Sequence, residues 1–241
     1  MSQSNITKHA DYGIDAPGVV RGLLISGVAT ISLGVLLATS SAFLLICGLL
    51  AGAAGLISAS IMLWSSKVGK FRMRDRLINS LEWRGDEKVL DVGCGHGLLL
   101  IAAAKQLKTG KAIGVDIWSQ VDQGSNRPEA TIENAHIEGV TDRVEVRDGD
   151  ARHLPFEDNS FDVIVTSLVI HNIRDRFGRD QAIHEIARVL KPGGRIAIHD
   201  MAHLRDYAQV LRNNGLADTA FSERIFLFNV FTHILTANKP I

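Results

Sequence analysis

The apolar positions of the chain follow two different patterns, which divide it near Lys67. No charged residue occurs between Arg21 and Lys67, whereas the later apolar runs are short and separated by charged residues. A membrane-spanning helix needs about 20 apolar residues, so the uncharged block is long enough for two of them. The block predicts helices at about Arg21–Ala38 and Ala42–Ser65. The alternative is a helical hairpin buried inside a globular core.

Small residues recur at helical spacing in both predicted helices. The second contains a Gly48-x-x-x-Gly52 pattern followed by Gly55, and the first has Gly27 and Gly34 on a similar stripe. Small side chains let two helices approach closely in lipid. The pattern favours a tightly packed hairpin, although glycine is also frequent in membrane helices in general.

Basic residues flank the uncharged block and indicate its orientation. Arg21 lies at the entry, and basic residues crowd the exit: Lys67, Lys70, Arg72, Arg74 and Arg76. Basic flanks favour the cytoplasmic side, and two spans return the chain to the side on which it started. We therefore expect a cytoplasmic segment at residues 1–20, a transmembrane hairpin over 21–66, and both termini in the cytoplasm.

Residues 67–83 are expected to form a basic amphipathic helix that links the hairpin to the rest of the chain. Val68, Phe71, Ile78 and Leu81 recur at helical spacing among the basic residues. Such a helix either lies on an anionic membrane surface or packs on the domain that follows it.

After Trp83, short apolar runs alternate with longer amphipathic ones. Several runs have the length and composition of buried strands: Lys88–Val92, Ala112–Ile117, Arg143–Val146, Phe161–Thr166 and Arg195–Ile198. The runs between them predict helices at Leu98–Leu107, Ala130–Glu138 and Arg179–Leu190. This alternation is typical of an α/β domain with a largely parallel sheet, here over residues 84–241. Phe226–Asn238 predicts one long final strand, paired with a strand near Ala220–Glu223.

The charge balance and the cysteine content argue against several classes of protein. Lysine plus arginine equal aspartate plus glutamate at 26 each, so the chain has no overall attraction for nucleic acid. Cys47 and Cys94 lie in very different contexts, so neither a disulfide framework nor a thiolate metal site is expected.

The stretch VLDVGCGHG, residues 89–97, is the most informative motif. Its three glycines directly follow a predicted strand, and glycine permits the close approach of a ligand to the backbone. The dinucleotide fingerprint Gly-x-Gly-x-x-Gly is not met, because Leu98 stands where its last glycine would fall. Asp91 would repel a pyrophosphate, and the lysine of a phosphate-binding P-loop is absent. A cofactor with a cationic centre suits Asp91 better.

The order of motifs along the chain resembles that of class I S-adenosylmethionine-dependent methyltransferases, over about Phe71 to Ile241. The motifs are VLDVGCGHG, AIGVDI, RDGDARHLPF, FDVIVTSLVIHNI and RVLKPGGRIAIHD. The resemblance implies a Rossmann-like, doubly wound sheet of seven strands, mostly parallel, with the last strand antiparallel. It also implies S-adenosylmethionine as the cofactor and methyl transfer as the activity.

The same resemblance implies which residues bind the cofactor. Asp116 is similar to the acid that holds both ribose hydroxyls, and Asp150 with Ala151 is similar to the adenine contact. Asp91 is expected to order the glycine loop and the cofactor amine. The expected set is Asp91, Gly93, Cys94, Gly95, His96, Gly97, Asp116, Ile117, Asp150, Ala151 and Ser167. The alternatives are structural, with Asp116 as a strand-end turn residue and Asp150 in an Asx turn.

The candidate catalytic residue is His171, which follows the fourth predicted strand where the family lines its reaction pocket. An imidazole can accept a proton from a hydroxyl or thiol, but His171 could equally shape the pocket. His199 and Asp200 are a second choice, and His184 is expected to be structural. Ser167 stands where metal-dependent enzymes of this kind present an acid, so a catalytic Mg²⁺ is not expected.

Motifs that are missing narrow the choice of acceptor. The fourth strand lacks the Pro-Pro-aromatic motif of amino-directed nucleic-acid methyltransferases, and the Pro-Cys nucleophile of cytosine-C5 enzymes is absent. What remains resembles enzymes that act on small molecules, and the apolar block adds the expectation of a lipophilic acceptor. Two alternatives stay open: a membrane-anchored S-adenosylmethionine sensor without catalysis, and a nicotinamide-dependent membrane reductase.

The position of the motifs also predicts a division of labour along the chain. All the expected cofactor residues follow Lys67. The hairpin is therefore expected to deliver the acceptor and not to take part in the chemistry. A chain that begins near Lys67 is expected to fold and to bind the cofactor.

Overall fold

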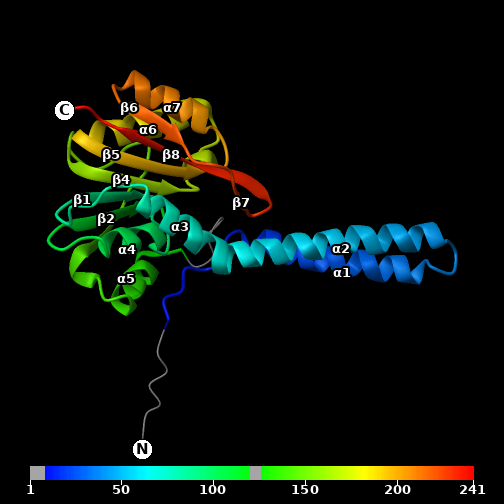
Figure 1. Ribbon diagram of the computed structural model, residues 1–241. Helices are drawn as coiled ribbons and strands as arrows, with labels where there is room; N and C mark the ends of the chain where they lie inside the picture. Colours follow the sequence, from blue (N-terminus) through cyan, green and yellow to red (C-terminus); the bar gives the residue numbers. More distant parts are fainter. Residues whose placement is uncertain (1–8, 120–125) are drawn as a thin grey trace, which may run out of the picture.

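A computed structural model describes residues 9–119 and 126–241 of the 241-residue chain. It consists of an α/β domain from which a long pair of antiparallel helices projects (Figure 1). The helices leave the domain on the side toward which the central parallel strands point, and this places their base beside the carboxyl ends of those strands.

The projecting pair consists of α1, Pro17–Leu36, and α2, Ala42–Trp64. Both helices are long and apolar enough to cross a membrane by length and composition, and only 17% of each apolar window is buried. The alternative of a hairpin buried in a globular core is therefore wrong. α1 begins at Pro17, four residues before the expected start, because proline is well tolerated in the first turn of a helix.

Glycines bring α1 and α2 into close contact, as their spacing predicts. A Cβ atom on Gly48 would lie 2.7 Å from the Cα of Gly34, and one on Gly52 would lie 2.6 Å from the carbonyl oxygen of Gly27. Any larger residue at these positions would push the two helices apart. The stripe thus fixes the spacing of the hairpin through backbone contacts.

The chain continues from α2 without a break through a π-helical turn, Ser65–Gly69, into α3, Lys70–Asn79. The expected linker helix over 67–83 is therefore the continuation of α2 and ends earlier. Met73 and Leu77 of α3 are buried in the same core cluster as α4, so this helix packs on the domain. Lys70 is also buried, which removes it from the basic flank expected to face a membrane surface.

The sheet has the strand order β3-β2-β1-β4-β5-β8-β6, with β7 paired to β8 beyond this path. The first strands are parallel to one another, whereas β8 is antiparallel to β5. The bounds are β1 Lys88–Val92, β2 Lys111–Asp116, β3 Val144–Asp148, β4 Phe161–Ser167, β5 Leu190–Asp200, β6 Ala217–Phe221, β7 Ile225–Leu227 and β8 Val230–Asn238. The Rossmann-like fold class is confirmed, and the described residues form eight strands where seven were expected.

Helices cover both faces of the sheet. The helices are α4 Leu98–Ala104, α5 Pro128–Ile137, α6 Arg176–Val189 and α7 Leu204–Asn213, of which α7 was not expected. Leu90 belongs to the core cluster that contains α6 and α7, whereas Val89 belongs to the cluster that contains α3 and α4. Successive residues of β1 thus face opposite layers, as a strand buried on both sides requires.

The strand order reverses between β1 and β4, and this positions the site. The chain runs outward from β1 to β3 and then returns to the other side of β1 to form β4. In open α/β sheets, ligands bind at the carboxyl ends of the strands that flank such a reversal. The loops after β1 and β4 contain the glycine motif and His171, respectively.

The carboxyl-terminal strands differ from the expected single strand over Phe226–Asn238. β7 and β8 form a two-residue hairpin whose turn residues, Phe228 and Asn229, have φ values of 53° and 63°. Positive φ at both central positions defines a type I′ turn, which most often contains glycine or asparagine. The phenylalanine in this turn gave no turn signal in the sequence.

Candidate functional site

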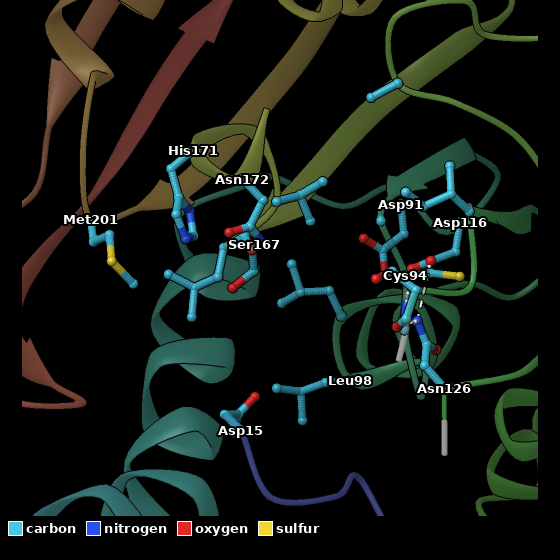
Figure 2. Close-up of a pocket in the computed structure, with 18 of the residues that line it drawn as sticks. Asp15, Asp91, Cys94, Leu98, Asp116, Asn126, Ser167, His171, Asn172 and Met201 are labelled. Atoms are coloured by element: carbon cyan, nitrogen blue, oxygen red, sulfur yellow. Dashed lines mark hydrogen bonds between the residues drawn. The ribbon is translucent and has the colours of Figure 1, made fainter. Parts of the chain in front are cut away.

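A cavity of about 690 Å³ lies at the carboxyl ends of β1, β2 and β4. Figure 2 shows Asp91, Asp116 and Asn126 on one side of it and His171 and Met201 on the other. Most of the expected site residues line it: Asp91, Gly93, Cys94, Gly95, Asp116, Ile117, Asp150, Ala151, Ser167 and His171. The sequence motifs therefore converge on one site.

His96 and Gly97 of the expected set are not among the residues that line the cavity. His96 is only 5% exposed, and its carbonyl accepts a hydrogen bond from the Asn134 side chain. Gly97 is the N-cap of α4, where a Cβ would come within 2.9 Å of Thr131. In this structure, both residues fasten the loop to α4 and α5.

The glycine loop needs its glycines partly for packing. Gly93 has φ 72°, and a Cβ there would lie 2.2 Å from the Val169 side chain. Strand β2 holds the loop in place, because the N–H groups of Gly93 and Cys94 donate to the carbonyl of Val115, at 2.8 and 3.1 Å. Cys94 is buried, and burial raises the pKa of its thiol well above the ordinary value, which disfavours a reactive thiolate.

Asp116 ends β2 and joins the loops around the cavity. Its carboxylate accepts hydrogen bonds from the Gly95 N–H at 2.8 Å, the Trp118 N–H at 2.6 Å and the Asn126 side-chain amide at 3.2 Å. A carboxylate offers about four acceptor positions, so little capacity remains for ribose hydroxyls while all three bonds persist. A ribose would therefore replace at least one of these donors. Asn126, which the sequence gave no reason to single out, is the side-chain donor among them.

Asp91 is buried beneath the glycine loop with only 2% of its surface exposed. Burial raises the pKa of its carboxyl to about 8, and the neighbouring Asp116 adds to the rise, whereas the Leu100 backbone N–H opposes it. A buried acid of this kind favours a cationic neighbour, because positive charge stabilises its ionised form.

Asp150 forms the Asx turn considered for it and also lines the cavity. Its carboxylate accepts a bond from the Arg152 backbone N–H at 2.9 Å, which makes an Asx turn, and it also pairs with the Arg152 guanidinium. This pairing lowers the pKa of the Asp150 carboxyl below its ordinary value. Asp150 and Ala151 nevertheless line the cavity, so an adenine contact is open to them.

A buried polar chain runs away from the cavity at Ser167. The Ser167 hydroxyl lies 2.9 Å from His199 Nδ1, and His199 Nε2 lies 2.9 Å from the Thr232 hydroxyl. Thr232 donates to the carbonyl of Ile225 at 3.0 Å, so its oxygen is free to accept from His199 Nε2. His199 Nδ1 then accepts from Ser167, which leaves the serine lone pairs for the cavity.

His199 is therefore not exposed for catalysis, which corrects its place as a second choice. It is completely buried, and burial lowers the pKa of its imidazole to about 4. Asp200, its partner in that second choice, is also buried but contacts His171. His184 lies on the surface with Nδ1 2.9 Å from the Asn214 side-chain oxygen, which is consistent with a structural role.

His171 lies in a 3₁₀ turn, Ile170–Asn172, directly after β4. Its Nδ1 lies 2.6 Å from the Asp200 carboxylate, and its backbone N–H donates to the same carboxylate at 3.2 Å. Asp200 also accepts from the Met201 N–H at 2.8 Å and from the Tyr207 hydroxyl at 3.5 Å. The acid is thus fixed by several donors and can orient the imidazole, whose ring points into the cavity (Figure 2).

The cavity continues beyond these motifs to the base of the helical hairpin. There it is lined by residues that precede or follow the motifs in sequence: Asp15, Ala16, Met62, Lys70, Met73, Phe228 and Val230. Most of these side chains are apolar, and they come from the segment just before α1, from α2 and α3, and from the β7–β8 hairpin. Met62 of α2 thus contributes to the wall of the cavity, while the expectation that the hairpin delivers the acceptor and takes no part in the chemistry stays a prediction.

The π-helical turn fastens these segments together. The Ser65 hydroxyl accepts a bond from the Phe228 N–H and the Ser66 hydroxyl accepts one from the Asp15 N–H, both at 3.0 Å. Lys70 donates to the carbonyls of Tyr12 and Gly13 at 2.7 and 2.8 Å. The amino-terminal segment and the β7–β8 turn are thereby held against the mouth of the site.

Comparisons with known proteins agree with this geometry. Residues 90–198 match the family described as Methyltransferase domain. Methyltransferase GfsG from Streptomyces halstedii is 39% identical over 131 residues, which are 54% of this chain and 43% of that protein. Demethylmenaquinone methyltransferase from Lactobacillus johnsonii is 30% identical over 168 residues, 68% of this chain and 61% of that protein. The chain thus spans about half the length of these curated relatives.

A solved structure shares the fold. Phosphoethanolamine N-methyltransferase 2 from Haemonchus contortus, in complex with S-adenosyl-L-methionine, aligns with a TM-score of 0.58 at 19% identity. The alignment covers 70% of this chain and 53% of that one. The α/β part of the chain is a class I S-adenosylmethionine-dependent methyltransferase domain, and its cofactor is S-adenosylmethionine.

Proposed function

We propose that the protein transfers the methyl group of S-adenosylmethionine to a small, lipophilic acceptor at a membrane. The observation that carries the proposal is the continuity of the cavity, which joins the acids near the glycine loop to apolar side chains at the hairpin base. One end suits a charged cofactor, and the other suits an apolar acceptor.

The residues of the charged end fit the cofactor. Bound S-adenosylmethionine supplies a methyl group on a positively charged sulfur, which is already activated for displacement. Asp91 would favour that positive charge, and Asp116 would accept the ribose hydroxyls in exchange for one of its present donors. Gly93, Gly95 and the Asp150–Ala151 pair line the same end and would bound the nucleoside.

The other wall of the cavity offers a base. In-line displacement mainly requires alignment, and a base is needed only where the acceptor arrives protonated. His171 would take that proton. The buried Asp200 carboxylate lies next to Nδ1 of the imidazole, so it can orient the ring and stabilise the imidazolium that forms. Ser167, whose proton is directed to His199, would accept a hydrogen bond from the acceptor.

Membrane anchoring would be the task of α1 and α2. Many of their exposed side chains are large and apolar, for example Ile25, Leu36 and Leu50. The basic residues after α2 would lie on the cytoplasmic side, together with the domain and both termini. Lys70 is not one of the basic residues that would face the membrane surface, because its side chain is buried. The relative from Lactobacillus johnsonii is named for demethylmenaquinone, and acceptors of that kind are candidates for this chain.

The test uses the full-length protein reconstituted into lipid vesicles and supplied with S-adenosylmethionine labelled in its methyl group. Native membrane extract supplies the acceptors. The proposal expects S-adenosylhomocysteine together with label in a product that partitions into organic solvent, and an Asp116→Ala variant with neither. Binding of the cofactor without any S-adenosylhomocysteine would establish the sensor in place of the enzyme. Label confined to water-soluble products would refute the lipophilic acceptor.

A further inference from the structure

The β7–β8 hairpin rests against the base of the helical hairpin (Figure 1). The Phe228 N–H donates to the Ser65 hydroxyl at 3.0 Å, and the Asn229 side chain donates to the Ser58 carbonyl at 3.1 Å. Gly69 leaves room for Leu227, because a Cβ there would lie 2.4 Å from that side chain. The β-hairpin is thus fixed to α2 and to the π-helical turn.

These contacts place the tip of the β-hairpin alongside the apolar part of α2. Ser58 precedes Trp64 by six residues, which corresponds to about 9 Å along a helix. Lys67, the first charged residue after α2, lies further on. Along the axis of α2, Asn229 therefore lies beside the apolar part of the helix and not beside the basic residues that begin at Lys67. One of its amide N–H groups already donates to a backbone carbonyl, which lowers the cost of placing the side chain in an apolar environment.

The outer surface of the β-hairpin is apolar. Phe226, Val230 and Phe231 are 46%, 38% and 56% exposed, and we call these three residues the tip patch. The rings of Phe226 and Phe231 pack with their centroids 5.4 Å apart. Exposed aromatic residues that adjoin one another on a short hairpin usually mark an interaction surface.

Aromatic rings and basic groups are paired around the tip patch. The Arg224 guanidinium lies 5.7 Å from the centroid of the Phe231 ring, and Arg72 lies 5.7 Å from the centroid of the Trp64 ring. Trp64 is itself 46% exposed at the end of α2. Aromatic side chains beside arginines are typical of the boundary between lipid tails and anionic headgroups.

The turn that carries the tip patch also forms part of the cavity. Phe228 keeps a positive φ of 53°, which is strained for a bulky residue. Phe228 lines the cavity together with Val230 and Met62 of α2. The strained turn therefore joins an exposed apolar surface to the apolar end of the site.

We propose that the tip patch inserts into the lipid leaflet beside the end of α2, and that the acceptor enters the cavity from this leaflet between α2 and the β7–β8 turn. This inference rests on the proposed membrane anchoring. It adds a second membrane-contacting element, which holds the apolar mouth of the site against the bilayer.

Site-specific fluorescence tests the inference on the full-length protein in vesicles of phosphatidylcholine and phosphatidylglycerol. Lipids with a nitroxide near the headgroup quench a polarity-sensitive fluorophore that lies at that depth. The fluorophore is placed at Phe231→Cys in a Cys47→Ser background, because Cys94 is buried. Phe221→Cys is the matched control: Phe221 is 47% exposed and pairs with Leu235, about 14 Å along β8 from Phe231.

A label on the native Cys47, which is exposed on α2, reports separately on the span. We expect a loss of emission and a blue shift at residue 231, neither at residue 221, and equal thermal unfolding of both variants. An unquenched label at 231 with a lipid-buried label at Cys47 would overturn the inference and leave the anchor intact. Equal quenching at 231 and 221 would also overturn it, because the whole domain would then lie on the membrane. Quenching at 231 with Cys47 in water would support the tip patch and refute the span.

Discussion

The Lys70 ammonium lies 3.1 Å from the Asp15 carboxylate, and the lysine side chain is only 5% exposed. Burial lowers the pKa of Lys70, and the Asp15 carboxylate opposes part of this effect. Because Lys70 also holds the carbonyls of Tyr12 and Gly13, this pair closes the amino-terminal segment over the site.

The first prediction concerns this pair. Asp15→Asn should lower the free energy of unfolding by about 1–3 kcal/mol, because a buried ammonium loses its countercharge but keeps two carbonyl acceptors. Asp75→Asn is the control, since the Arg74–Asp75 pair is far more exposed and should contribute about 0–1 kcal/mol. Denaturant titration in detergent measures both. Equal effects of the two substitutions would show that Lys70 does not depend on Asp15.

The second prediction revises the expectation that a chain beginning at Lys67 folds and binds the cofactor unaided. Tyr12 is buried in the core cluster that contains α3 and α4, and Asp15, Ala16 and Met62 line the cavity. Removal of residues 1–66 should therefore lower the thermal stability and weaken cofactor binding. A protein that keeps residues 1–16 joined to residue 65 through a flexible linker should recover most of both. Full cofactor affinity in the chain without residues 1–66 would show that Asp15, Ala16 and Met62 are not needed for cofactor binding.

Much of the fold could be predicted because its strands are short apolar runs with clear ends. Lys88–Val92 coincides with β1, since Val89, Leu90 and Val92 form a short apolar run that ends at the glycine loop. The break between β7 and β8 could not be predicted, because Phe228 takes a conformation that normally selects glycine or asparagine. Contacts with Ser65 and Ser58, remote in sequence, hold that turn.

The site was predictable only where sequence motifs follow the strands. His171 and Asp116 were found in this way, and both line the cavity. The Asp15–Lys70 pair was missed because the two residues lie 55 positions apart in sequence. Asn126 was missed because it belongs to none of the recognised motifs, although its partner Asp116 is only ten residues away. The prediction of His199 as a second-choice catalytic residue was wrong. Its position at the end of β5 does not show from sequence alone whether the side chain is buried or faces the cavity.

The third prediction follows from the raised pKa of Asp91. With a pKa of about 8, this carboxyl is mostly protonated at pH 7 before the cofactor binds. A cationic ligand favours the ionised form, so binding of S-adenosylmethionine should release up to about one proton at pH 7. Calorimetry in buffers of different ionisation enthalpy measures the release. The same release from an Asp91→Asn variant would assign the proton to another group.

The fourth prediction concerns His199 and acid stability. Its folded pKa of about 4 lies below the ordinary 6.5, so the unfolded chain binds more protons between these values. The free energy of unfolding should therefore fall by about 3 kcal/mol as the pH drops from 6.5 to 4, and His199 should cause no further loss below that. Replacing the exposed His184 with Gln should leave this slope unchanged, whereas His199→Gln should reduce it. An unaltered slope in His199→Gln would refute the assignment.

The last prediction separates the two roles open to His171. As a general base, it should be needed for turnover and not for cofactor binding, so His171→Ala should lower the rate about 10²–10⁴-fold with little change in cofactor affinity. Asp200→Asn should lower the rate less, because it leaves the imidazole in place and removes only the charge that orients it. It should also shift the pH dependence of the rate, which a purely structural residue would not do. Methyl transfer into membrane extract, normalised to bound cofactor, gives these rates. His171→Ala could instead weaken cofactor binding and leave the rate per bound cofactor unchanged. That result would show that His171 shapes the pocket and is not the base that takes the acceptor's proton.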